Sequence, residues 1–336
     1  MAETQGVMVF AEQTEGRVHP VAYELLGKGR EIADALGAEL SAVLVGSGME
    51  AAAQELVYRG ADVVYLYDHD ALATFDIMNY RRNVVDLVQE VKPEVLLLGA
   101  TAIGRSLGPR LAAALGTGLT ADCTALEVDQ ERHLVQIRPA FSGNILAHIK
   151  TETRPQMATV RYKVMQALAR DCDRKGRVVR CRATIRDPLA VLSRVPTSET
   201  GAVNVSEADV VVCGGRGLHK PDDIKLLRDL AAAMGGVVAC SKPLVDSGWF
   251  EKEHLVGFSG HTVKPRLYLA IGVSGSSQHL IGMRTSDTIM AINNDPAAPI
   301  FEVSDYAIVG DLYEVVPRLT AAVRRMREAD EQAVCT

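Results

Sequence analysis

Along the first hundred residues, short apolar runs alternate with longer stretches in which apolar residues recur every three or four positions. Pro20 suits the first turn of one such periodic stretch, and Gly37 suits its end. The pattern predicts alternating strands and helices at 7–12, 20–36, 41–47, 49–58, 62–68, 79–91 and 94–100. Because the strand runs contain no regular polar positions, we expect a mainly parallel sheet that is buried between helices on both faces.

The pattern changes after Gly116, where the apolar runs become shorter and more polar. Further strands are predicted at 124–129, 133–152 and 156–165, extending the sheet in mixed or antiparallel fashion. From about Asp171 to Asn204 the chain is charged and aperiodic. We place the domain boundary there, which gives an N-terminal α/β domain of residues 1–200 and a C-terminal α/β domain of residues 201–336.

The second domain repeats the alternation of strands and helices. Strands are predicted at 209–217, 237–241, 267–273 and 289–293, and a terminal helix at about 312–330. Between the third of these strands and the next, the turn G-V-S-G-S-S-Q-H (272–279) leads from a strand into a helix. Such a turn leaves N–H groups free at a helix start, where they bind anions and most often phosphate. No Lys stands beside the turn, which argues against a nucleoside triphosphate P-loop.

Composition narrows the class of protein. The 336 residues are 48% hydrophobic, which is enough for two domain cores, and the formal net charge is -6 with scattered basic residues. Nucleic acid is therefore not an expected partner. The start of the chain lacks the character of a targeting segment, and no apolar run reaches the length of about 18 residues that a membrane span requires. We expect a cytoplasmic protein without a membrane span.

Metal chemistry is not indicated by the sequence. Its six cysteines lie far apart without a C-x-x-C pair, and its eight histidines include no H-E-x-x-H motif. We therefore expect neither a structural zinc nor a cysteine-ligated iron–sulfur cluster.

Three motifs of the second domain resemble the alpha subunit of electron transfer flavoproteins. They are P-R-L-Y-L-A-I-G-V-S-G-S-S-Q-H-L-I-G-M (265–283), A-I-N-N-D-P-A-A-P-I-F (291–301) and D-Y-A-I-V-G-D-L-Y-E-V-V-P (305–317). The first domain resembles the family more loosely, through 101–126 and 138–147. The resemblance implies a Rossmann-like C-terminal domain that binds FAD, a heterodimer with a beta subunit, and transfer of electrons between dehydrogenases.

The resemblance also assigns roles to single residues. Arg216 matches the arginine that contacts the flavin, and its guanidinium suits a phosphate or a flavin carbonyl. The serines that match phosphate-binding positions are Ser241 and Ser274. The residues that match the adenosine-binding positions are Asn293, Asp311 and Leu312. Without the motifs around them, the serines and Asp311 would be interpreted as helix caps or turn residues.

Gln278 and His279 match the pair beside the pyrimidine ring of the flavin, and the preceding turn contributes Gly275, Ser276 and Ser277. A donor near this ring stabilises the negative charge that spreads there on one-electron reduction. The sequence alone does not distinguish a ring N–H of His279 from its backbone N–H. A lone histidine in a turn is usually a structural residue.

Two segments depart from the family pattern. Lys242 stands where the family commonly has Arg, and its V-G-Q-T segment is replaced by Val256, Gly257, Phe258 and Ser259. Lys keeps the positive charge but loses the planar fork of Arg. Ser259 keeps a hydroxyl that can reach the flavin N5, whereas Phe258 loses an amide. We expect FAD binding to survive and the flavin potential to shift.

Two versions of the function follow from the resemblance. In the first, the heterodimer is an electron-bifurcating complex: NADH reduces a second FAD in the beta subunit, and the alpha subunit relays single electrons to an acyl-CoA dehydrogenase. The loop G-F-S-G-H-T-V-K-P (257–265) resembles members from anaerobes and favours this version. In the second, the protein is a simple carrier. Arg138 is a candidate to face the flavin of the partner subunit. A structural salt bridge within this chain is an equally good interpretation of Arg138.

Two other classes fit the sequence poorly. A serine hydrolase would use Ser274 with His279, but G-V-S-G-S is not the G-x-S-x-G motif, because its fifth residue is Ser276 and not Gly, and no acidic partner is placed by the pattern. A self-sufficient NAD-dependent dehydrogenase would need G-x-G-x-x-G after the first strand, and the chain has A-E-Q-T-E-G there.

Overall fold

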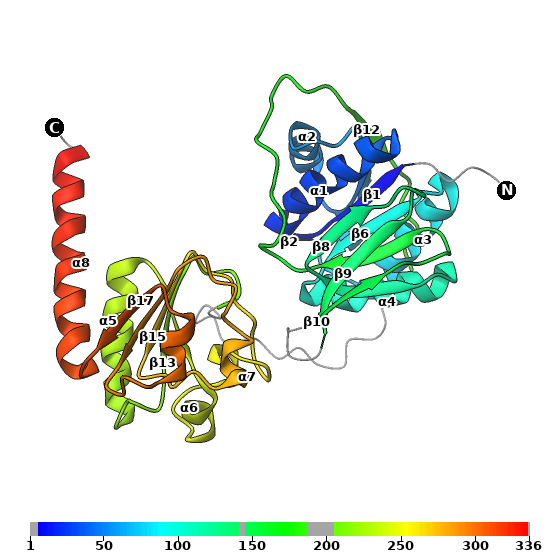
Figure 1. Cartoon of the computed structure of the whole chain (residues 1–336). Coiled ribbons are helices and arrows are strands. Elements are labelled where there is room, and N and C mark those ends of the chain that lie inside the picture. The colour runs from blue at the N-terminus through cyan, green and yellow to red at the C-terminus, as the bar shows by residue number, and fades with distance from the viewer. Residues whose placement is uncertain (1–5, 141–144, 187–204, 335–336) are drawn as a thin grey trace. The chain divides into compact units, whose positions relative to one another are not determined.

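The computed structural model describes residues 6–140, 145–186 and 205–334. The chain forms two compact units, residues 1–193 and 194–336, each built around its own parallel sheet (Figure 1). The predicted α/β class with two helix-flanked sheets is confirmed. The predicted boundary after residue 200 lies outside the described residues.

The first unit is built on a seven-stranded sheet in the order β12-β5-β4-β1-β6-β11-β7. Every pair in it is parallel. Its strands are β1 (Val7–Ala11), β4 (Leu40–Gly46), β5 (Val63–Asp68), β6 (Val95–Gly99), β7 (Leu119–Cys123), β11 (Gln156–Val160) and β12 (Arg177–Arg180). The loops of this unit contain a small hairpin, formed by β2 (Gln13–Thr14) and β3 (Arg17–Val18), and the 3-10 turn η1 (Asp70–Leu72).

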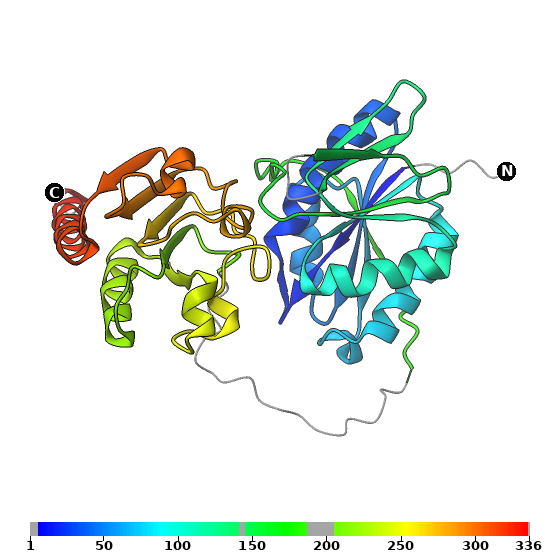
Figure 2. The same cartoon turned by 60° about the horizontal axis from the view of Figure 1, so that its bottom comes forward.

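Helices cover both faces of this sheet (Figure 2). They are α1 (Pro20–Leu36), α2 (Glu50–Tyr58), α3 (Ile77–Val91) and α4 (Ala102–Leu115). Successive residues of a strand point to opposite faces, so Val7 and Val9 pack with α1 and α2, and Met8 and Phe10 pack with α3 and α4. Full burial on both faces explains why these strands contain no polar alternation.

The prediction for the strands after Gly116 is wrong in part. β7 and β11 extend the main sheet in parallel, and β11 lies inside it, between β6 and β7. The antiparallel strands form a separate sheet, β8 (Ala125–Val128), β9 (Leu134–Ala140) and β10 (Ile145–Ile149). All five residues of β11 are buried, which is the burial expected of a central strand.

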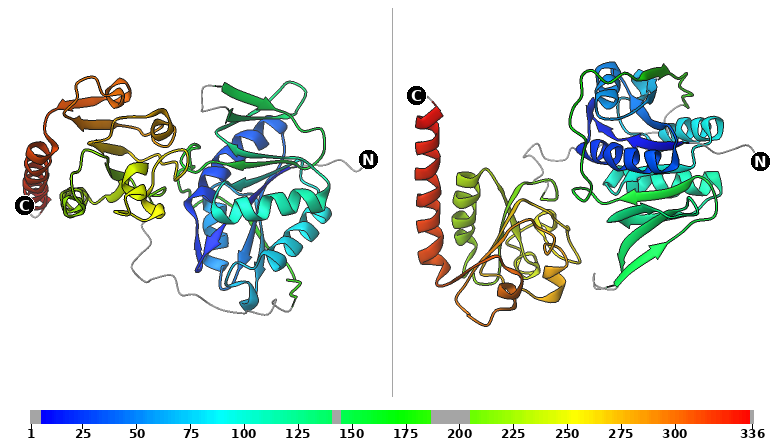
Figure 3. Two further views of the ribbon diagram at one scale, coloured as in Figure 1. Left: turned by 90° about the horizontal axis from the view of Figure 1, so that it is seen from below. Right: turned by 45° about the horizontal axis from the view of Figure 1, so that its top comes forward.

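The second unit has a five-stranded, fully parallel sheet in the order β14-β13-β15-β16-β17. Its strands are β13 (Val210–Gly214), β14 (Val237–Cys240), β15 (Leu267–Ile271), β16 (Ile289–Asn293) and β17 (Tyr306–Val309). Its helical segments are η3 (Pro221–Asp223), α5 (Ile224–Met234), α6 (Lys242–Asp246), η4 (Lys252–His254), α7 (Ser277–Leu280), η5 (Pro299–Val303) and α8 (Leu312–Val334). α5 and α8 lie side by side over one face (Figure 3). Among the helices described, none combines the length and apolar character that crossing a bilayer requires.

Strand β12 was not predicted, because all four of its side chains are exposed and leave no apolar pattern. It is an edge strand of the sheet and pairs with β5, and an ion-pair network beside it attaches this part of the chain to the sheet. Asp62 accepts hydrogen bonds from Arg30 Nη1 (2.7 Å), from Arg174 Nη2 (2.7 Å) and from the Leu40 N–H (2.9 Å). Burial alone would raise the pKa of Asp62, but the Leu40 N–H and the two arginines together hold it below its ordinary value.

We expect Asp62→Asn to lower the free energy of unfolding of the first domain by about 2 kcal/mol at pH 7, since it leaves Arg174 without its carboxylate and Arg30 with only the exposed Asp34. Because the pKa of Asp62 is lowered on folding, its stabilisation is present above the ordinary value of 3.8 and is lost as the pH falls below it. Urea unfolding of both proteins at pH 7 and pH 3 should show the difference shrinking in acid.

Asp34→Asn is the matched control. Asp34 also pairs with Arg30 (Nε to Oδ1, 2.9 Å), but its side chain is 67% exposed, so its removal should cost about 0.5 kcal/mol or less. Equal losses from the two variants would contradict the role assigned to Asp62.

Candidate functional site

The second sheet reverses its strand order between β13 and β15, and this reversal creates the site. From β13 the chain first adds β14 on one side and then crosses over to add β15 on the other. The segments after these strands leave the same edge of the sheet in opposite directions. Open α/β sheets bind ligands in the crevice that such a reversal leaves.

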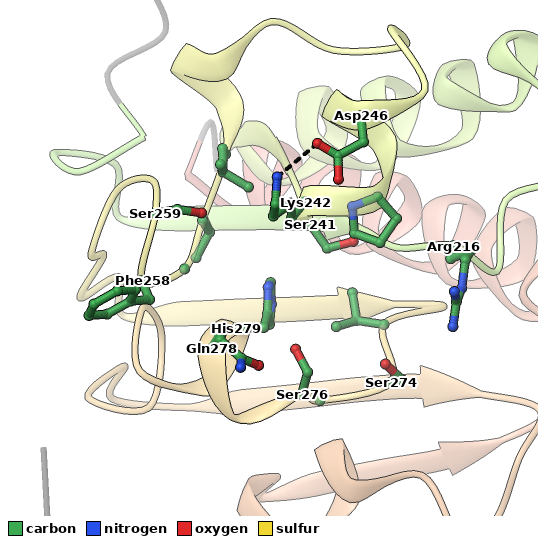
Figure 4. Close-up of a pocket in the computed structure, with 16 residues that line it drawn as sticks. Arg216, Ser241, Lys242, Asp246, Phe258, Ser259, Ser274, Ser276, Gln278 and His279 are labelled. Carbon is green, nitrogen blue, oxygen red and sulfur yellow. Dashed lines mark hydrogen bonds and ion pairs between the residues drawn. The ribbon is translucent and has the colours of Figure 1, made fainter. Parts of the chain in front are cut away.

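A cavity of about 460 Å³ lies at this edge (Figure 4). Every site residue predicted from the sequence lines it except Ser277, Asn293, Asp311 and Leu312. Sequence reasoning did not single out four further lining residues, Pro243, Asp246, Leu255 and Val273. Of these, Asp246 had a signal in the sequence, because it stands four positions after Lys242 in a helix.

Glycines allow the loops after β13 and β15 to touch. A Cβ atom on Gly215 would lie 2.3 Å from the carbonyl oxygen of Gly272, and one on Gly275 would lie 2.3 Å from the nitrogen of Ile300. Gly272 (φ 63°) and Gly275 (φ 85°) also adopt left-handed conformations that other residues rarely tolerate. Glycine is therefore required at these positions for the turn to reach its observed shape.

The turn presents a row of free donors, as the sequence predicted. The N–H groups of residues 274–278 form no hydrogen bond with any residue that the structure describes. The helix that follows, α7, is only one turn long, so the donors come from the loop and not from a long helix. Consecutive free N–H groups in such a turn form a concave site for an anion.

Polar side chains around the cavity are equally free of internal partners. Within the described part of the chain, Arg216, Ser259, Ser274, Ser276 and Gln278 make no side-chain hydrogen bond or ion pair. Polar groups in folded proteins normally find partners in the protein or in bound molecules. The arrangement therefore suits a large polar ligand with an anionic part.

The loop from Val256 to Ser259 is attached to α7. The Phe258 N–H donates to the Gln278 carbonyl (2.8 Å), and Gly257, at φ 142°, lies against the same carbonyl. The Phe258 side chain is 72% exposed at the cavity. Its main chain thus supports the loop, although its side chain lacks the amide common in the family.

Lys242 does not present a free positive charge to the cavity. Its Nζ lies 2.8 Å from Asp246 Oδ1, one turn further along α6. Both side chains are more than half exposed, and both line the cavity. The pair is close to neutral, so Arg216 is the described cavity residue that carries an uncompensated charge.

His279 lies in the cavity wall and is 5% exposed. Its Nε2 is 3.0 Å from the Tyr268 hydroxyl, whereas its Nδ1 is buried and forms no hydrogen bond of ordinary geometry in the described structure. Burial lowers the pKa of His279 to about 4, and the neighbouring Val256 carbonyl offsets this only in part. The imidazole is therefore neutral at pH 7.

The predicted residues outside the cavity support its walls. Asn293 Nδ2 donates to the carbonyl of Val273 (2.9 Å), a lining residue. Asp311 accepts from the Tyr313 N–H (2.8 Å) as the N-cap of α8, and Leu312 packs against Gly217 and Gly272. Their predicted contacts with adenosine therefore stay predictions.

Together, a parallel sheet with reversed strand order and a donor-lined turn define a nucleotide-cofactor-binding α/β domain. Comparison with known protein families identifies the family within this class. Residues 7–185 match the electron transfer flavoprotein domain, and residues 204–284 match the electron transfer flavoprotein FAD-binding domain. The chain belongs to the electron transfer flavoprotein family, as an alpha subunit, and its cofactor is FAD.

Curated relatives match over nearly the whole chain. The electron transfer flavoprotein subunit alpha of Thermoanaerobacterium thermosaccharolyticum is 44% identical, covering 97% of this chain and 100% of its own length. That of Clostridium acetobutylicum is 47% identical, covering 96% and 98%. The subunit LctC of a lactate dehydrogenase (NAD(+),ferredoxin) from Acetobacterium woodii is 44% identical, covering 95% and 77%. An alpha subunit implies a beta subunit as its partner.

The residues of the cavity fit this cofactor. The free N–H groups of 274–278 and Arg216 suit the pyrophosphate and the polar edges of the ring, and the side chains of Ser259, Ser274 and Gln278 at the same cavity have no internal partner among the described residues. FAD supplies the electron chemistry when it is bound, and the protein supplies its position and electrostatic surroundings.

We expect Asp246→Asn to bind FAD roughly twofold to fivefold more tightly, because it frees the charge of the exposed Lys242 beside an anionic cofactor. Flavin fluorescence titration at low salt measures the dissociation constant. The control is Asp287→Asn, which makes the same change in net charge at an exposed position outside the cavity. If both variants gain equally, the Lys242–Asp246 pair has no local effect.

Proposed function

We propose that this alpha subunit works in a flavin-based electron-bifurcating complex. It passes single electrons between a beta subunit, which holds a second FAD and takes electrons from NADH, and a partner acyl-CoA dehydrogenase. The observation that carries the proposal is the loop 257–265, whose residues Gly257, Phe258 and Ser259 line the cavity of the second domain together with the turn of free donors. This loop resembles members from anaerobes, and relatives from anaerobes are close along the whole chain.

One cofactor per alpha chain is supported by the first domain. Its sheet also reverses strand order, between β1 and β6, but Glu12 lies at that edge. The Thr101 hydroxyl donates to the Glu12 carboxylate (2.5 Å) and accepts from the Gly104 N–H (3.0 Å). A buried carboxylate there repels phosphate, so a second nucleotide cofactor is expected in the beta subunit.

Arg138 is proposed to face the flavin of the beta subunit. It lies half-buried on β9 and makes no ion pair or hydrogen bond with any residue that the structure describes. The alternative of an internal salt bridge therefore has no support within the described residues. A guanidinium without an internal partner suits an anionic group on another subunit.

The identity of the dehydrogenase has a second candidate. The relative named as a lactate dehydrogenase (NAD(+),ferredoxin) subunit favours a partner that oxidises a 2-hydroxy acid. The cavity serves either partner, and it also serves a simple carrier, because electron transfer depends on the cofactor and not on the substrate of the partner.

The first test is to reconstitute the alpha–beta heterodimer and titrate it anaerobically with NADH. A bifurcating complex should contain two flavins per heterodimer and be reduced by NADH alone. A heterodimer with one flavin that does not react with NADH would be a simple carrier, and the bifurcation proposal would then be wrong. Addition of an acyl-CoA substrate with its dehydrogenase, or of a 2-hydroxy acid with its dehydrogenase, identifies the partner class.

The second test concerns the site residues. Arg216→Gln should weaken FAD binding roughly tenfold to hundredfold, since a hydrogen bond to a charged group contributes about 1.5 to 3 kcal/mol. Equilibrium dialysis of the heterodimer measures the loss. Arg266→Gln is the control, because Arg266 is exposed in the same domain and does not line the cavity. Unchanged affinity in Arg216→Gln would remove Arg216 from the site.

A further inference from the structure

A cavity in the first unit is lined by arginines, and the function proposed above does not use it. It lies beside α3 and has a volume of about 180 Å³. Small-molecule ligands usually occupy pockets of about 300 to 1,000 Å³, so this cavity suits a small ion. The residues described in its wall are three arginines, one carboxylate and two apolar side chains: Arg81, Arg82, Arg186, Asp86, Met78 and Val85. We call it the arginine cavity.

Two buried asparagines of α3 hold the segment 184–186 against the helix and so form one wall of this cavity. Asn83 accepts a hydrogen bond from the Thr184 N–H (2.7 Å) and donates one to the Thr184 carbonyl (3.0 Å). Asn79, one turn earlier, accepts from the Arg186 N–H (2.9 Å) and donates to the Arg186 carbonyl (3.3 Å). The two asparagines are 3% and 1% exposed. Their amides replace the pairing of a neighbouring strand, and they fix Arg186 beside the arginines of α3.

The arginines of the cavity have few partners within the described structure. Arg82 Nε lies 4.0 Å from Asp86 Oδ2, which is the outer limit of an ion pair. Arg81 makes one long hydrogen bond, from its Nε to the Arg110 carbonyl on α4 (3.4 Å). The Arg186 side chain makes no hydrogen bond or ion pair with any residue that the structure describes. Positive charges held close together repel each other, and an anion between them removes the repulsion.

A phosphate-type oxyanion matches this wall in charge and in shape. A guanidinium binds two oxygens of a phosphate at once through its planar fork, and a tetrahedral anion presents oxygens to several forks. The wall is accessible, since the side chains of Arg82 and Asp86 are 40% and 54% exposed. Asp86 repels an anion, but its exposure to water screens that repulsion. The three arginines therefore outweigh it.

We propose that the arginine cavity is a binding site for a small phosphate-type oxyanion, held by Arg81, Arg82 and Arg186. The occupant is free phosphate or a small phosphomonoester, which share the phosphate group. Arg186 stands close to the end of the first unit at residue 193. A bound oxyanion that joins Arg186 to α3 holds the point at which the chain leaves this helix.

The test uses the FAD-loaded alpha–beta heterodimer, in which the donor turn of the second domain is occupied and does not compete for the probe. Hydrogen–deuterium exchange at residues 184–186 is measured with inorganic phosphate and with chloride at equal ionic strength. Saturating phosphate should slow exchange of the Thr184 and Arg186 N–H groups roughly threefold to tenfold, because it stabilises the attached state of this segment. Stronger protection by a short-chain phosphomonoester at the same concentration identifies an organic phosphate as the occupant, and weaker protection identifies free phosphate.

Variants of the wall assign the effect to this cavity. Arg186→Gln and Arg81→Gln should each raise the phosphate concentration for half-maximal protection roughly tenfold or more, since each removes a charged fork. Asp86→Asn should lower that concentration roughly twofold to fivefold, because it removes a carboxylate from the wall. Arg182→Gln is the matched control, since Arg182 is exposed in the same segment and does not line the cavity, and it should leave the concentration unchanged.

Three results would overturn the inference. Equal protection by phosphate and by chloride would show general screening of charge. Phosphate protection that is undiminished in both Arg186→Gln and Arg81→Gln would place the anion elsewhere. Amides that are fully protected without phosphate, and that phosphate does not change, would show that a side chain of the partner subunit fills the cavity. The site is independent of bifurcation, so a heterodimer that does not react with NADH leaves the phosphate result standing.

Discussion

The contact between the loops after β13 and β15 is the constraint on which the site depends. Main-chain atoms of Gly215 and Gly272 approach so closely that no side chain fits between them. This contact fixes the turn that follows β15, and with it the direction of the free N–H groups of 274–278. Two further segments support the same turn: Asn293 donates a hydrogen bond to the Val273 carbonyl, and Leu312 packs against Gly272. The domain thus holds its donors in place before any cofactor binds, which reduces the ordering cost of binding.

Charge distinguishes the two domains more clearly than topology does. Both sheets reverse their strand order, and both present loops at the edge where ligands bind. The first has Glu12 at that edge, bonded to Thr101, and the second has Arg216 and unpaired amides. The two edges therefore differ in charge although both sheets reverse their strand order, and what such an edge can bind depends on the side chains placed there.

The sequence predicted most of the buried strands and helices, because burial leaves a periodic apolar pattern, but it did not predict α4 or β7. It did not predict β12, whose side chains are all exposed, or the separate sheet of β8 to β10, because strand partners are chosen by tertiary packing. Motif resemblance located most of the cavity but not the ion pair of Lys242 with Asp246. The hydrogen bond between Tyr268 and His279 was not predicted either, because a tyrosine in an apolar strand has the sequence pattern of an ordinary core residue.

The deep burial of Cys213 has a consequence for how the second domain can be followed experimentally. A thiol with a strongly raised pKa that is closed off from solvent is inert toward alkylating reagents and peroxide while the domain stays folded. Cys240, which is fully buried in the core on the other face of the same sheet, shares this protection. The labelling rate of these two sulfurs therefore measures how often the cofactor domain opens, and a bound ligand that holds the domain closed will slow it.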